Sequence, residues 1–134
     1  MFRQFRKQEV LNLFISTSIP ENIENIVKFA KDINVNIEIS NLVNPELLDS
    51  KDFELTVDKF YNALQDFSGK ISLHGAFLDL SPASKDSKII EVTKYRYDQS
   101  FSIAKKLNAK TVVFHTGYNG QVKVRVYSEK FIED

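Results

Sequence analysis

Short apolar runs alternate along this chain with longer segments in which apolar residues recur at helical spacing. The runs cover residues 11–19, 35–40, 70–77 and 111–115, and their length and composition predict strands. Between them, apolar residues three and four positions apart predict helices over residues 23–33, 53–67 and 87–107, with one short turn at 45–48. This order predicts parallel strands joined by crossover helices.

The number of predicted units sets the architecture that we expect. The chain has 134 residues and four predicted strands, followed by a short extension at 122–126 and the start of a further helix at 128–134. A complete (β/α)8 barrel has eight strands and typically about 250 residues. We therefore expect one domain over residues 1–134 that forms the N-terminal half of a TIM barrel, about four βα units.

Polar side chains lie at the C-terminal ends of the predicted strands. Because side chains alternate between the faces of a strand, one set is expected to face the helices: Ile37, Ile39, Ile71, Leu73, Val112 and Phe114. The other set is expected to face the barrel interior: Asn36, Glu38, Ser72, His74, Thr111, Val113 and His115. The active site of such a barrel is built at the C-terminal strand ends, so Glu38, His74 and His115 are predicted to point toward one region.

These three side chains are of metal-ligand or acid/base types. His74 and His115 are the only histidines of the chain, and both end apolar strands in the same phase. A hydrogen-bonded structural role for each histidine stays open, as does a role for Glu38 as an ion-pair partner at the barrel mouth. We predict that Glu38, His74 and His115 bind substrate, and no residue is assigned a catalytic role.

Composition excludes several classes of protein. The chain has 18 basic and 18 acidic residues, so its balanced charge argues against a nucleic-acid partner. It has no cysteine, which excludes disulfides, thiolate zinc sites and a cysteine nucleophile. No apolar run approaches the roughly 20 residues of a membrane span, and the first residues lack the apolar core of a signal peptide. We therefore expect a cytoplasmic protein without a membrane partner.

Four stretches resemble a known superfamily. They are LHGAF at 73–77, DLSP at 79–82, AKKLNA at 104–109 and VVFHTGY at 112–118. Together they resemble the xylose-isomerase-like barrels, which include sugar-phosphate isomerases and epimerases and the endonuclease IV type of apurinic-site endonuclease (AP endonuclease family 2). The resemblance runs from the first strand to the loop after the fourth.

The resemblance implies roles for the two histidines. His74 and His115 match the positions of two zinc ligands in the endonuclease branch. In the isomerase and epimerase branch, carboxylates and a histidine from later strands hold the metal, and two glutamates act as acid and base. Those strands lie beyond the four of this chain, so only His74 and His115 are assigned as ligands of a divalent metal, with zinc, manganese and magnesium left open.

Three functions follow as hypotheses. The first is the N-terminal part of a metal-dependent sugar or sugar-phosphate isomerase or epimerase, with a small sugar or sugar phosphate as its partner. The second is hydrolysis of a phosphodiester at abasic DNA by bound zinc. The third is an inactive half-barrel that self-associates, because four open strands expose two unpaired edges and one apolar sheet face.

Overall fold

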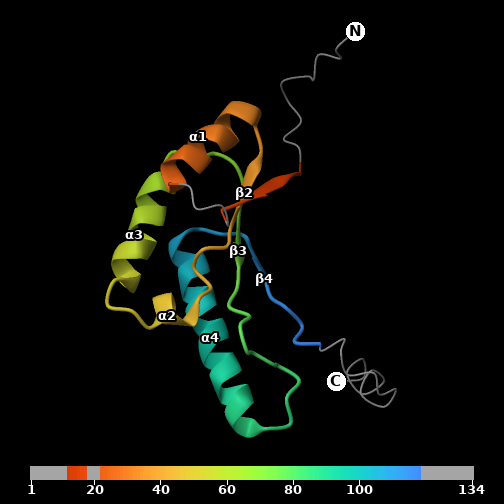
Figure 1. Cartoon of the computed structure of the whole chain (residues 1–134). Helices are drawn as coiled ribbons and strands as arrows, with labels where there is room; N and C mark the ends of the chain where they lie inside the picture. Colours follow the sequence, from red (N-terminus) through yellow and green to blue (C-terminus); the bar gives the residue numbers. More distant parts are fainter. Residues whose placement is uncertain (1–11, 18–21, 119–134) are drawn as a thin grey trace.

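The computed structural model describes residues 12–17 and 22–118 (Figure 1). Strands and helices alternate in the predicted order: β1 (Phe14–Ser16), α1 (Ile23–Ile33), β2 (Asn36–Ile39), α2 (Pro45–Leu48), α3 (Phe53–Leu64), β3 (Ile71–His74), α4 (Ser87–Lys106) and β4 (Thr111–Val113). The predicted extension at 122–126 and helix start at 128–134 lie outside the described residues.

Element existence and order are confirmed, whereas several predicted ends are wrong. The predicted strand at 70–77 ends at His74, and the strand at 111–115 ends at Val113. At the ends of these strands the Gly75 N–H donates a hydrogen bond to the Val113 carbonyl, at 2.8 Å, and neither strand continues beyond this pair. His115 therefore lies two residues past β4, at the start of a loop.

The four strands form one parallel sheet in the order β1-β2-β3-β4. Connections between neighbouring parallel strands are right-handed in about 98% of cases, which places successive crossover helices on the same face of the sheet. In Figure 1, α1 and α3 lie together on one side of the strands. A doubly wound fold reverses its strand order and places helices on both faces. The predicted α/β class is therefore confirmed, and the sequential order is consistent with half of a βα-repeat fold.

The helix-facing side of the sheet carries the hydrophobic core. Ile37, Ile39 and Leu73 are fully buried there and belong to one core cluster with Val57 of α3 and Ile103 of α4. This is the set that strand alternation assigned to the helices. Burial of each such side chain stabilises the fold by about 1.5–3 kcal/mol, so this layer holds the sheet and the helices together.

Helix α1 shows why the local sequence forms the predicted element. Its apolar residues recur on one side of the helix and are buried: Ile23, Ile26, Val27 and Ala30. The Asn22 side chain accepts a hydrogen bond from the Glu24 N–H at the start, and Asn34 ends the helix in the left-handed conformation at φ 56°. Asparagine tolerates both positions because its short amide can cap a helix and can adopt the left-handed region.

The opposite face of the sheet is polar, so the expectation of an open apolar face is wrong. Strand alternation assigns eight residues of the four strands to it: Phe14, Ser16, Asn36, Glu38, Ser72, His74, Thr111 and Val113. Only Phe14 and Val113 among them are apolar. Asn36 is fully buried, and its amide oxygen accepts a hydrogen bond from the Lys70 N–H at 2.8 Å. Buried polar groups of this kind are stable only when they are hydrogen-bonded.

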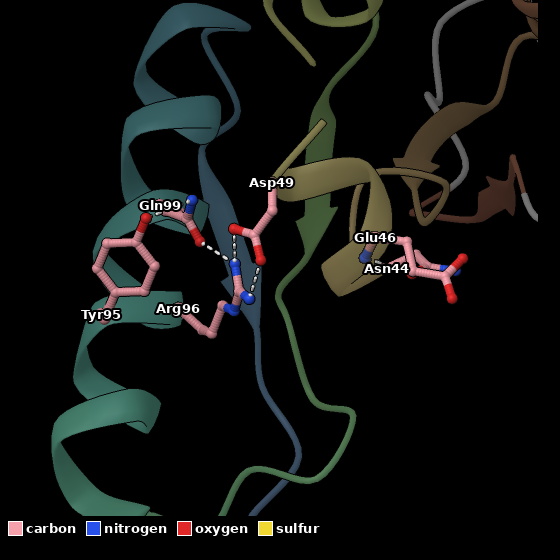
Figure 2. A network of polar contacts seen from close by, with 6 residues as sticks. All are labelled: Asn44, Glu46, Asp49, Tyr95, Arg96 and Gln99. Carbon is pink, nitrogen blue, oxygen red and sulfur yellow. Dashed lines mark hydrogen bonds and ion pairs between the residues drawn. The ribbon is translucent and has the colours of Figure 1, made fainter. Parts of the chain in front are cut away.

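An ion pair joins the C-terminal end of α2 to α4 (Figure 2). The Arg96 guanidinium donates to both carboxylate oxygens of Asp49, at 2.7 and 2.6 Å, and also to Gln99 at 2.9 Å. Hydrogen bonding by Arg96 lowers the pKa of Asp49 below its usual range. The pair therefore contributes stability above the ordinary carboxyl pKa, and this contribution is lost as the pH falls through the lowered pKa. Arg96 thereby positions α2, which follows the strand that carries Glu38.

None of the helices in the described ranges is both long enough and apolar enough to span a membrane.

Candidate functional site

The sheet register brings the predicted polar residues to one edge. Ser16 of β1 is aligned with Glu38 of β2, and His74 of β3 is aligned with Val113 of β4. Because the strands are parallel, their C-terminal ends meet at the same edge of the sheet. Glu38 and His74 lie at or next to the ends of their strands, and His115 follows β4 by two residues.

Glu38, His74 and His115 form a continuous chain of contacts. Glu38 Oε1 lies 3.0 Å from His74 Nδ1, and His74 Nε2 lies 3.1 Å from His115 Nε2. The side chains of His74 and Glu38 are 21% and 30% exposed, so solvent and ligands can reach this pair. The structure thus brings together all three residues that the sequence analysis selected, and their roles as ligands stay predictions.

The carboxylate of Glu38 determines the orientation of the His74 ring. An ionised carboxylate only accepts hydrogen bonds, so His74 Nδ1 carries a proton and donates it. In a neutral ring, His74 Nε2 then presents a lone pair toward His115, and the 3.1 Å contact is made by a proton on His115 Nε2. Histidines that bind metals are commonly arranged in this way, with the second nitrogen donating to a carboxylate.

Phe77 packs against both imidazoles from the loop after β3. Its ring is stacked on that of His115, with centroids 4.2 Å apart, and meets the ring of His74 edge-on at 5.3 Å. Phe77 was predicted to lie at the end of the strand at 70–77 and had no predicted role at the site. Phe77 follows His74 by three residues and lies just beyond the end of β3. An aromatic residue at this position, close to a strand-end histidine, could have indicated a role at the site.

An aromatic cluster behind the sheet holds the segment that carries His115. The Phe114 ring packs against Tyr97 at 4.0 Å and against Phe101 at 5.4 Å, and the Tyr97 hydroxyl donates to the His115 carbonyl at 3.4 Å. Burial raises the pKa of Tyr97, so this hydroxyl keeps its proton at neutral pH. The helix-side packing of Phe114 therefore determines where His115 lies.

Hydroxyl groups continue the polar edge toward β1. Ser16 Oγ lies 2.7 Å from Ser40 Oγ, and the Ser40 N–H donates to Thr17 Oγ1 at 3.0 Å. Ser40 follows Glu38 by two residues and is therefore expected on the same face of the sheet. This spacing could have identified Ser40 as a candidate site residue from the sequence. These hydroxyls can donate to or accept from a polar ligand at the strand ends.

The two histidines fit a divalent metal as a partial ligand set. Two imidazole nitrogens bound to one zinc ion at about 2.0–2.1 Å lie roughly 2.9–3.4 Å apart in tetrahedral or octahedral geometry. The 3.1 Å between the Nε2 atoms of His74 and His115 agrees with this separation. Residues 12–17 and 22–118 contain no group of three or more His, Cys, Asp or Glu side chains that could hold a metal. Zinc sites use three or four protein ligands, so further ligands are needed.

Comparison with known proteins supports the fold. No protein-family model matches the chain, and no curated protein matches it. A solved structure of the TTHB071 protein from Thermus thermophilus, soaked with ZnCl2, is similar, with a TM-score of 0.57 and 24% sequence identity. The similarity covers 81% of this chain and 40% of that protein, so the chain spans about two fifths of its length. This likeness shows the fold alone, and membership of the xylose-isomerase-like superfamily stays a prediction.

Proposed function

We propose that this chain supplies the N-terminal half of a metal-dependent barrel enzyme that acts on a sugar or sugar phosphate. In this proposal His74 and His115 bind a divalent metal, and Glu38 orients His74. The observation that carries the proposal is the 3.1 Å approach of the two Nε2 atoms, with His74 Nδ1 engaged by Glu38. An isomerase or epimerase reaction fits the resemblance of the sequence motifs.

Zinc is the first metal to test. Imidazole suits zinc well, and the structural neighbour was soaked with ZnCl2. A metal bound here would polarise the oxygens of a sugar substrate. The chain's own contribution is to hold two ligands at the required separation and to keep the His74 lone pair directed at the metal position.

The residues around the histidines favour a substrate that carries hydroxyl groups. The strand residues assigned to the polar face include Ser16, Ser72 and Thr111, and none of the eight is lysine or arginine. Serine and threonine hydroxyls can exchange hydrogen bonds with sugar hydroxyls. A DNA backbone would instead require a cluster of cations, because phosphate contacts dominate its affinity.

Hydrolysis of a phosphodiester at abasic DNA is the second candidate. The direct approach of both imidazoles favours it, because the corresponding histidines of the endonuclease branch are both zinc ligands. Zinc-loaded protein would be titrated with a sugar phosphate and with a duplex containing an abasic site, and binding followed by NMR line broadening. Binding of the sugar phosphate that is lost when zinc is removed supports the first proposal. Binding of the duplex without the sugar phosphate contradicts it and supports the second.

Replacing Glu38 with alanine is expected to weaken zinc binding about 10–100-fold, the usual effect of removing the partner of a metal-binding histidine. Without the carboxylate, His74 Nδ1 loses its 3.0 Å contact and the ring is free to adopt the other tautomer. Competition with a chromophoric chelator measures the affinity. Glu46→Ala on the exposed surface of α2 is the matched control. Equal affinities in the Glu38 and Glu46 variants would exclude an orienting role for Glu38.

We also propose that the chain self-associates through its open sheet edges. Within the described residues β1 pairs with β2 and β4 pairs with β3, so β1 and β4 are the outer strands of the sheet. Apolar side chains near these edges are exposed, among them Leu13 at 55% and Val113 at 42%. Such edges associate with other strands. Sedimentation velocity is expected to give a mass above that of one chain, and a monomer at every concentration would contradict the proposal.

A further inference from the structure

A cavity lies at the opposite end of the sheet from the histidines. It has a volume of about 400 Å³ and is bordered by the C-terminal ends of α3 and α4 and by the segments that lead into β3 and β4. Ligand pockets typically measure about 300–1,000 Å³, so this cavity can accept a small molecule. Neither the proposed metal site nor the polar face of the sheet extends to it.

The charge of the cavity lining is one-sided. Three lysines line it, Lys70, Lys106 and Lys110, whereas no aspartate or glutamate does. Lys106 is neutralised from outside the cavity, because its ammonium group contacts Glu54 at 3.0 Å and Asp58 at 2.8 Å. Its position in the last turn of α4 also matches the negative end of the helix dipole. These ion pairs and the helix dipole therefore account for the charge of Lys106 without a ligand in the cavity.

In the part of the chain that the structure describes, no comparable ion pairs account for the charges of Lys70 and Lys110. Lys70 directly precedes β3 and Lys110 directly precedes β4, and these strands are neighbours in the sheet, about 4.8 Å apart. Within the described residues each ammonium group contacts only a neutral amide oxygen, from Asn12 at 3.2 Å and from Asn108 at 2.7 Å. Two lysines without a carboxylate partner in that part of the chain therefore line one cavity.

The rest of the lining combines polar and aromatic groups. Ser68 and Gln65 offer hydrogen-bond donors, whereas Tyr61 and Phe67 offer ring surfaces. Ammonium groups with hydroxyl and amide donors bind phosphate groups, and aromatic side chains provide apolar contact for an organic portion. A second cavity of about 260 Å³ shares Phe67 and Lys70 and adds Lys31, again without a carboxylate in its lining.

We propose that this cavity binds the phosphate group of a small phosphorylated molecule, with Lys70 and Lys110 as its cationic ligands. The site lies at the N-terminal ends of the strands and is separate from the proposed metal site. Its ligand therefore does not require the chemistry proposed for His74 and His115. The proposal would stand if zinc binding failed.

Titration of the full chain with inorganic phosphate tests the proposal, with binding measured by calorimetry. The Lys70→Gln/Lys110→Gln variant is expected to bind phosphate at least about tenfold more weakly, because two charged hydrogen-bond donors are lost. The matched control is Lys28→Gln/Lys94→Gln, which removes two exposed lysines of α1 and α4 that line neither cavity. The control is expected to retain the phosphate affinity of the unmodified chain.

Three outcomes would overturn the proposal. These are no phosphate binding by the unmodified chain, equal weakening in the two double variants, and binding of a DNA duplex through Lys70 and Lys110 without binding of phosphate. Zinc affinity, measured on the same samples, is expected to be unchanged by Lys70→Gln/Lys110→Gln. A loss of phosphate binding with retained zinc binding therefore separates this site from the metal site and rules out unfolding as the cause.

Discussion

Replacing either His74 or His115 with alanine is expected to weaken zinc binding about 100-fold or more. The described residues hold no larger group of metal-ligating side chains, so each variant leaves a single imidazole of the pair. Full structural zinc sites gain about 10–16 kcal/mol from four ligands, which makes the loss of one ligand a change of several kcal/mol. Chelator competition at fixed pH measures the affinity.

The control for the histidine variants has to separate ligand loss from unfolding. Lys94→Ala on the exposed side of α4 is expected to keep the affinity of the unmodified chain, and thermal unfolding of all the proteins without metal tests their stability. Zinc binding should also weaken as the pH falls, because protons compete with the metal for the imidazole nitrogens. Unchanged zinc affinity in both histidine variants would refute the proposed metal site.

Replacing Gly75 with alanine is expected to destabilise the fold by about 1–3 kcal/mol, the usual cost of overpacking. A Cβ atom at this position would lie 2.2 Å from Cε1 and 2.5 Å from Cδ1 of the Phe114 ring. That ring cannot easily move, because it packs against Tyr97 and Phe101 of α4. Denaturant unfolding measures the loss. Since Phe114 precedes His115, we also expect weaker zinc binding by this variant.

A double variant provides the control for Gly75. The Phe114→Leu substitution removes the aromatic atoms that the new methyl group would contact. Gly75→Ala should therefore lower the free energy of unfolding less in that background than in the unmodified chain. Non-additivity of this kind is expected for residues in direct contact. A cost of Gly75→Ala that is the same in both backgrounds would show that its effect does not act through Phe114.

Local patterns were sufficient to predict the existence and order of the elements and to select the candidate site residues. The spacing of Ile23, Ile26, Val27 and Ala30 predicted α1 with its observed bounds, since a helix repeats every 3.6 residues. Strand ends were predicted less well, because a strand stops where its neighbour stops pairing with it. The end of β3 at His74, for example, depends on the path of the chain after Val113.

The contacts that the candidate site residues make could not be predicted from local sequence patterns. Alternation assigned Glu38 and His74 to one face, yet their 3.0 Å contact also depends on the register between β2 and β3. Phe77 was assigned to a strand, whereas the structure places it in a loop over both histidines. The lysine-lined cavity joins residues from four segments, and the balanced charge of the whole chain gave no sign of it.

The sequence by itself determined the alternation of strands and helices and the polar ends of the strands. These features follow from periodicity, which acts over a few neighbouring residues. Only the tertiary structure decided that His74 Nε2 and His115 Nε2 approach to 3.1 Å, although the two residues are 41 positions apart in the sequence. That distance results from strand pairing and from the packing of Phe114 behind the sheet, both of which join parts of the chain that are remote in sequence.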